Sequence, residues 1–186
     1  MSAYNLRISG FTKALQEKNL KDLFGVEVGV FDGSHCWGFL ETLDIKRLYM
    51  VDPYVSYERH IKDVGLERSQ WLLARAKKRS KIWAEEKFPG KCFHIYEKSL
   101  DAVKDFGDES LDFVYLDGDH TYENVSKEIP AWEAKLKHGG LMGGHDYSKR
   151  RAEVIKAVDE YCKKHSIKFE VVGDKRYAAD WYFWKK

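Results

Sequence analysis

Short apolar runs of strand length alternate with segments of helical period along almost the whole chain, and this alternation limits the possible folds more than any other feature. Between the runs, apolar residues recur every three or four positions, most clearly over 122–136. Strands that alternate with helices predict parallel pairing through right-handed crossovers. The strand-like runs are 24–30, 47–53, 92–98, 111–118, 139–146, 168–174 and 180–186.

The last two runs are separated only by a few residues around the sequence KRYAA, which is too short for a helical crossover and suits a hairpin. We therefore expect an α/β fold with a mainly parallel seven-stranded sheet, one antiparallel strand near the C-terminus, and helices on both faces. We expect a single domain over 1–186, with a helical segment at 1–23. Two helices over 54–90 are expected to cover the site.

The composition is that of an ordinary globular protein. The chain has 186 residues, 44% of them hydrophobic and 33% charged, and a formal net charge of only +2. This balance gives no global electrostatic reason to expect nucleic acid or a membrane as partner. The three cysteines are scattered and form no CxxC pair, and the N-terminus has no apolar stretch of signal-peptide type, so we expect a cytoplasmic protein with reduced thiols.

The first predicted strand leads into a turn with the sequence VEVGVFDGSH, in which Gly29 and Gly33 flank the bend and Ser34 is placed to cap the next helix. A dinucleotide-binding turn needs a second glycine two positions after the first. This chain has Phe31 there, followed by Asp32, and neither suits a pyrophosphate. The turn therefore favours a nucleoside without phosphates, and better one that carries a positive charge.

Two carboxylates flank this turn. Glu27 interrupts an apolar strand, and a buried carboxylate needs a partner, which could be an ammonium group of the ligand or a structural Arg or Lys. Asp52 ends the second strand roughly twenty residues after Gly29, the spacing at which an acidic residue meets ribose hydroxyls. Together with the glycine turn, these residues predict a nucleoside site.

A second polar cluster follows the fourth and fifth strands. The sequence LDFVYLDGDHTYENV carries Asp117, Asp119 and His120 out of an apolar strand, and His145 and Asp146 end the next one. Because neighbouring parallel strands lie about 4.8 Å apart, these side chains can converge on one point. Simpler readings are that Asp117 belongs to a turn, that Asp119 caps a helix and that His120 is a packed surface ring.

The chain resembles the class I S-adenosylmethionine-dependent methyltransferases, and within them a small bacterial and phage group marked by Asp-Gly-Asp-His and His-Asp-Tyr motifs. The resemblance rests on four segments in this order: VEVGVFDGSH, VDPY, LDGDHTYENV and LKHGGLMGGHDY. It covers roughly 24–186 and implies a Rossmann-like methyltransferase fold with S-adenosylmethionine as cofactor.

The resemblance also implies a set of cofactor contacts. Asp52 would hold the ribose, and Tyr54 would pack on the adenine. Many relatives have Asp after the third strand, near the adenine amino group, but this chain has Lys98 and Ser99, so we assign Ser99 as the substitute. The other residues implied around the cofactor are Glu27, Gly29, Phe31, Gly33, Ser34 and Asp117.

In resembling enzymes that use a divalent cation, acidic residues at these two strand tips bind the ion, which orients a substrate hydroxyl. We assign Asp117, His145 and Asp146 to the metal. The carboxylates suit Mg²⁺, whereas an imidazole ligand fits Mn²⁺ or iron better. His120 is the expected catalytic base because its unperturbed pKa lies near working pH, and Asp119 would orient it or add a ligand.

We therefore expect an S-adenosylmethionine-dependent methyltransferase that methylates an oxygen of a small hydroxylated molecule, such as a sugar or a diol, with metal assistance. The alternatives are a nucleic-acid or protein methyltransferase, which would use the basic segment 75–81, a nucleotide-binding oxidoreductase, and a Rossmann-like binding protein without activity. The expected partner is a small molecule rather than nucleic acid or a membrane, and the aromatic C-terminus suits a homodimer.

Overall fold

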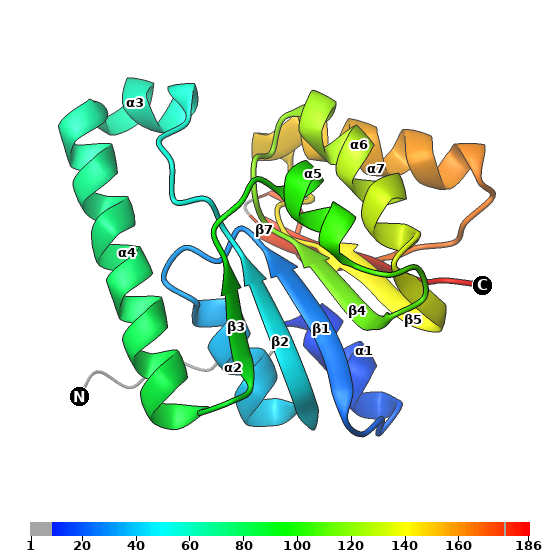
Figure 1. The fold of residues 1–186 in the computed structure, drawn as a ribbon. Coiled ribbons are helices and arrows are strands. Elements are labelled where there is room, and N and C mark those ends of the chain that lie inside the picture. The colour runs from blue at the N-terminus through cyan, green and yellow to red at the C-terminus, as the bar shows by residue number, and fades with distance from the viewer. Residues whose placement is uncertain (1–8, 177) are drawn as a thin grey trace.

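The computed structural model describes residues 9–176 and 178–186, without the side chains of residues 59 and 60. One seven-stranded sheet runs through these residues in the order β3-β2-β1-β4-β5-β7-β6 (Figure 1). The strands are β1 (Leu23–Val28), β2 (Ile45–Val51), β3 (Cys92–Ile95), β4 (Leu111–Leu116), β5 (Leu136–Gly144), β6 (Glu170–Asp174) and β7 (Ala178–Trp184).

The pairing is the one that the sequence predicts. The strands β1 to β5 pair in parallel, and β7 runs antiparallel to both β5 and β6. The fold is Rossmann-like, with the order of strands reversing between β1 and β4. Ligands of open α/β sheets bind at such a reversal, beyond the carboxyl ends of the strands.

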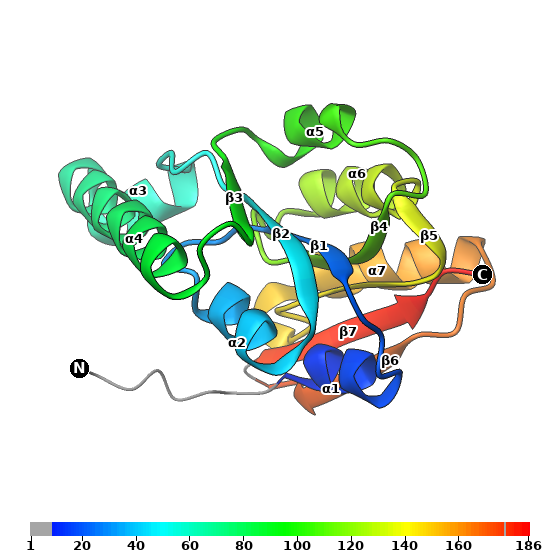
Figure 2. The same cartoon turned by 60° about the horizontal axis from the view of Figure 1, so that its bottom comes forward.

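Helices cover both faces of the sheet (Figure 2). They are α1 (Gly10–Glu17), α2 (Ser34–Thr42), α3 (Glu58–Val64), α4 (Leu66–Lys87), α5 (Ser99–Ala102), α6 (Tyr122–Glu133) and α7 (Ala152–Lys164), with single 3-10 turns at Val103–Asp105 and Lys149–Arg151. Alternate residues of β4 face opposite layers because side chains alternate along a strand. Val114 and Leu116 join the core with α5, α6 and α7, whereas Phe113 and Tyr115 join the core with α1, α2 and α4.

Three of the helical segments predicted from the sequence can be compared with the observed helices. The two helices predicted over 54–90 are α3 and α4, and α1 lies within the predicted N-terminal helical segment, of which residues 1–8 are outside the described part. The helix predicted over 122–136 ends at Glu133, so its extension to Leu136 is wrong. Leu136 opens β5 and pairs with Leu111 of β4, which explains its apolar character without a helix.

None of the described helices combines the length and the apolar character that a membrane span needs.

Candidate functional site

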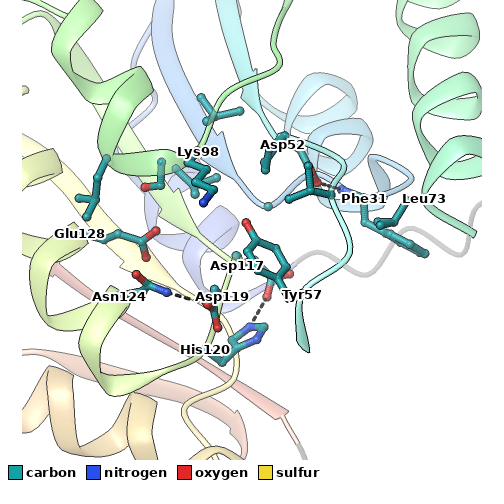
Figure 3. Close-up of a pocket in the computed structure, with 18 of the residues that line it drawn as sticks. Phe31, Asp52, Tyr57, Leu73, Lys98, Asp117, Asp119, His120, Asn124 and Glu128 are labelled. Carbon is teal, nitrogen blue, oxygen red and sulfur yellow. Dashed lines mark hydrogen bonds and ion pairs between the residues drawn. The ribbon is translucent and has the colours of Figure 1, made fainter. Parts of the chain in front are cut away.

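A cavity of about 490 Å³ opens at the carboxyl ends of β1, β2 and β4 (Figure 3). This volume lies within the range of small-molecule and cofactor pockets. Its walls come from the turn after β1, the end of β2, the start of α5, the turn after β4 and the first half of α6. Val55 and Tyr57 before α3, Asp63 of α3 and Leu73 of α4 also line it.

The turn after β1 has the backbone that its glycines predict. Gly29 has a φ of 86°, and a Cβ placed on it would lie 2.1 Å from the carbonyl oxygen of Asp117, so only glycine fits there. Gly33 has a φ of 81° and is the N-cap of α2, packed against the ring of Trp83. Gly29 and Phe31 line the cavity. The turn therefore brings backbone close to any ligand.

Ser34 does not cap α2, and that expectation is wrong. It is the first residue of the helix, and the N-cap is Gly33. The carboxylate of Asp32 instead accepts hydrogen bonds from the backbone N–H of Ser34, at 3.2 Å, and from its hydroxyl, at 2.6 Å. Arg79 and Trp83 of α4 also contact Asp32, the indole donating to its backbone carbonyl. These contacts fix the turn against α4.

Asp52 is held rigidly at the end of β2. Its Oδ2 accepts from the backbone N–H of Phe31 at 2.8 Å, and its Oδ1 accepts from the backbone N–H of Tyr54 at 2.7 Å. Asp52 also lines the cavity. Tyr54 is placed differently from the sequence-based expectation. Its hydroxyl is bound to the carbonyl of Phe31 and to Ser80 of α4, and Val55 and Tyr57 line the cavity wall in its stead.

Glu27 is 1% exposed, as expected for a carboxylate inside a central strand. Neither an Arg nor a Lys is its partner in the described ion pairs. Instead the Nδ1 of His35 lies 3.6 Å from its Oε1, and the thiol of Cys36 donates to its Oε2. Burial raises the pKa of Glu27, against the effect of His35 and Cys36. Glu27 therefore stabilises the segment after the turn through His35 and Cys36, and it is not among the residues that line the cavity.

Asp117 lies at the centre of the second cluster, at the tip of β4. Its Oδ1 is 3.2 Å from the Nε2 of His120 and 3.7 Å from the Nδ1 of His145, and its Oδ2 is 3.3 Å from the Nδ1 of His35. Burial acts to raise the pKa of Asp117, but the hydrogen bonds from His120 and His35 and the charges of His35 and His145 outweigh it and hold the pKa well below its usual range. Asp117 is therefore a carboxylate at neutral pH.

Asp146, after β5, completes the cluster. Its Oδ2 is 3.3 Å from the Nε2 of His120 and 3.2 Å from the Nε of Arg151, and its Oδ1 is 3.3 Å from the Nδ1 of His145. Asp117, His120 and Asp146 each offer one ligand atom, and these atoms all lie within 4.8 Å of one another. Two carboxylate oxygens and an imidazole nitrogen are a donor set that suits Mn²⁺, iron or zinc better than Mg²⁺.

Of the residues predicted to bind the metal, Asp117 and Asp146 belong to this group, whereas its imidazole is that of His120, which the sequence suggested as a base, and not that of His145. His145 lies beside the group, with its Nδ1 near both carboxylates. Asp119 also lines the cavity, and it has a local structural role as well. Its Oδ1 accepts from the backbone N–H of Thr121, the N-cap of α6, and its Oδ2 accepts from the side-chain amide of Asn124 at 2.6 Å.

Glu128 is a cavity residue that the sequence analysis missed. It lies on α6, is 4% exposed and faces Ser99, which also lines the cavity. Burial raises its pKa to about 7, against a hydrogen bond from Ser99. Its position carried a signal, because Glu128 stands three residues after Val125 and four before Trp132, on the apolar face of the helix. A charged residue on such a face is rarely fully buried unless it is paired with another polar group.

The fold and the cavity define an α/β protein with a nucleoside-sized site at the reversal of strand order. A family model described as "Methyltransferase domain" matches residues 26–147, which include both polar clusters. The chain belongs to this methyltransferase family. Together with the fold, the family places the protein among the S-adenosylmethionine-dependent methyltransferases.

Solved structures share the fold at low sequence identity. A SAM-dependent methyltransferase from Aquifex aeolicus superposes with a TM-score of 0.63 at 15% identity, over 98% of this chain and 93% of that one. The O-methyltransferase NovP superposes with a TM-score of 0.65 at 20% identity, over 95% of this chain and 76% of that one. In sequence, the chain is 24% identical over 164 residues to "Uncharacterized protein R132" of Acanthamoeba polyphaga mimivirus, covering 82% of this chain and 67% of that protein.

Proposed function

We propose that the protein transfers the methyl group of S-adenosylmethionine to a hydroxyl oxygen of a small substrate, such as a sugar or a diol, at a site that holds a divalent cation. The observation that carries this proposal is the convergence of Asp117, His120 and Asp146, of which Asp117 and His120 line the cavity. The O-methyltransferase NovP has the same fold, which supports transfer to oxygen.

The charges around the cavity suit this cofactor. Six carboxyl groups line it, against two cationic side chains, those of Lys98 and Arg151. Such a lining favours a ligand with a sulfonium and an ammonium group and disfavours one with phosphates. Gly29 would allow the methionine part to approach the backbone, and Asp52, at the end of β2 on the cavity wall, would hold the ribose hydroxyls.

The residues at the strand tips would divide the chemistry. Asp117, His120 and Asp146 would hold the cation, which lowers the pKa of a coordinated hydroxyl when bound. Asp119 lies two residues after Asp117 on the cavity wall, and its carboxylate would take the proton of the substrate hydroxyl. Methyl transfer is an in-line displacement, so the remaining contribution of the chain is to position cofactor and acceptor.

The Asp-Gly-Asp-His and His-Asp-Tyr motifs contribute most of this cluster, and we propose on that ground that the chain belongs to the small bacterial and phage group that carries both.

A small acceptor fits the chain better than a macromolecule. Basic residues of the segment 75–81 are engaged elsewhere, Arg79 with Asp32 and Lys77 over the ring of Tyr96.

The test is a calorimetric titration of the purified protein with S-adenosylhomocysteine, with and without Mn²⁺ or Mg²⁺, and with NAD as control. We expect micromolar binding of S-adenosylhomocysteine, none of NAD, and a separate binding event for Mn²⁺. Hydroxylated acceptors are then screened for release of S-adenosylhomocysteine from S-adenosylmethionine. Binding of NAD in place of S-adenosylhomocysteine would overturn the proposal. Methyl transfer at an unchanged rate in the presence of chelators would show that the reaction needs no metal ion.

A further inference from the structure

Two buried polar side chains, Ser99 of α5 and Glu128 of α6, line the cavity where these two helices meet it. Ser99 begins α5, directly after β3, and Glu128 comes from the middle of α6. Figure 3 shows the carboxyl group of Glu128 directed into the cavity, on the side of Lys98 and opposite Phe31 and Leu73. Glu128 is only 4% exposed, so water does little to solvate it from outside the cavity.

The hydrogen bonds of this pair have a defined direction. The indole Nε1–H of Trp132 donates to the Oγ of Ser99 at 2.9 Å. The hydroxyl proton of Ser99 is therefore free to donate to Glu128, whose pKa that hydrogen bond acts to lower. A carboxylate can accept about four hydrogen bonds. Burial of a carboxylate without enough hydrogen-bond donors around it costs free energy of folding. The side of Glu128 that faces the cavity is suited to a hydrogen-bond donor of a ligand.

Three other acidic residues of the cavity already have partners within the protein. Asp52 accepts two backbone N–H groups, and Asp119 accepts from Thr121 and Asn124. Asp101 lines the same end of the cavity as Glu128, but it is exposed and paired with Lys104 at 2.8 Å. Water competes for an exposed carboxylate and weakens its hydrogen bonds to a ligand.

The order of the strands fixes which end of a nucleoside would meet Glu128. The reacting groups lie at β4 and β5, the ribose-binding carboxylate Asp52 lies at β2, and Ser99 follows β3 at the edge of the sheet. A cofactor with its methyl group at Asp117 and its ribose at Asp52 therefore has its base toward Ser99 and Glu128. This step rests on the proposed function.

We propose that Glu128 binds the exocyclic amino group of the cofactor's adenine and so selects the base. The amino group is a hydrogen-bond donor and the neighbouring ring nitrogen N1 is an acceptor. A carboxylate matches the donor, and a protonated carboxyl group matches both. The raised pKa of Glu128 is consistent with the second arrangement, in which the acid is neutral in the buried site.

The experiment compares calorimetric affinities for S-adenosylhomocysteine and for its analogue with unsubstituted purine in place of adenine, which lacks only the amino group. We expect the wild-type protein to prefer S-adenosylhomocysteine by about tenfold or more, since hydrogen bonds to such groups are worth roughly that factor. Glu128→Ala should bind both ligands equally. Glu128→Gln should keep the preference, because its amide carbonyl accepts from the amino group while its NH₂ donates to N1.

Asp101→Ala is the matched control, since it removes a carboxyl group from the same end of the cavity and should leave the preference unchanged. Equal wild-type affinity for the two ligands would overturn the assignment of Glu128, and this arm needs no folded variant. A preference that survives in Glu128→Ala would also overturn it. Failure of the wild-type protein to bind S-adenosylhomocysteine at all would instead overturn the proposed function, and the assignment of Glu128 with it.

Discussion

The Nδ1 of His35 lies 3.3 Å from the Oδ2 of Asp117 and 3.6 Å from the Oε1 of the buried Glu27, so one ring nitrogen faces both carboxyl groups. Burial acts to lower the pKa of His35, but hydrogen bonds to Asp117 and Glu27 and the charges of both carboxyl groups outweigh it and raise the pKa to about 11. His35 is therefore an imidazolium at neutral pH. His35 orients Asp117 through its Oδ2, whereas His120 faces its Oδ1.

Removal of this imidazolium is expected to affect both metal binding and stability. His35→Ala leaves Asp117 without one of its orienting partners, and loss of such a partner typically lowers metal affinity by about 10–100-fold. It also leaves buried carboxyl groups without their cation, which costs about 3 kcal/mol of unfolding free energy. Mn²⁺ titration and guanidinium denaturation measure the two effects. His138→Ala, at an exposed histidine, is the control, and unchanged Mn²⁺ affinity in His35→Ala would contradict the orienting role.

Asp117→Asn tests the metal cluster without changing the size of the side chain. We expect Mn²⁺ affinity and methyl transfer to fall by more than about 100-fold, since a direct ligand should matter more than its supporting contacts. Affinity for S-adenosylhomocysteine should change much less, because Asp52 and the glycine turn hold the cofactor. Calorimetry with each ligand separates the two. Glu123→Gln serves as control at an exposed carboxylate of α6, and an active Asp117→Asn enzyme would exclude the proposed role.

Two glycine-to-alanine substitutions should shift stability in opposite directions. Gly29→Ala places a Cβ 2.1 Å from the carbonyl oxygen of Asp117 at a positive φ, so we expect a loss of about 1–3 kcal/mol and weaker cofactor binding. Gly38 lies inside α2 with nothing within 4 Å of an added Cβ. Gly38→Ala should therefore stabilise the protein by about 0.5–1 kcal/mol. Thermal unfolding of both variants checks the signs, and a stable Gly29→Ala with normal affinity would refute the close approach.

Glu128 should make the apo protein's stability depend on pH in an identifiable window. Its pKa rises from 4.5 to about 7 on folding, so the folded state binds more protons than the unfolded state between these values. The contribution of Glu128 to stability therefore falls as pH rises through the window, by about 3 kcal/mol in total. The side chain of the Glu128→Gln variant cannot titrate. The unfolding free energy of this variant, relative to that of the wild-type protein, should therefore increase by that amount between pH 4.5 and pH 7. Parallel denaturation curves for the two proteins would show that Glu128 is not buried as an acid.

Much of the architecture was predictable because it follows from local patterns. The apolar runs and the helical spacing between them report which residues are buried, and they led to the seven strands, the parallel neighbours β4 and β5 and the closing antiparallel strand. The same reasoning put Asp117 and Asp146 at adjacent strand tips, since parallel strands end at one edge of a sheet. The limit of helix α6 was less well predicted, because Leu136 is equally apolar as a strand residue.

The contacts of the buried polar groups were decided by the tertiary structure. Periodicity shows that Glu27 and Glu128 lie on buried faces, but not that His35 and Cys36 reach Glu27 across the glycine turn, or that Ser99 of the neighbouring helix α5 reaches Glu128. The hydrogen bond between Tyr54 and Ser80 of α4 was equally hidden from the sequence, because it joins segments that are far apart along the chain. The sequence by itself determined which segments are buried and which strand tips carry carboxylates. Only the packing of distant elements decided what each buried polar group faces, because a hydrogen-bond partner is selected by proximity in space and not along the chain.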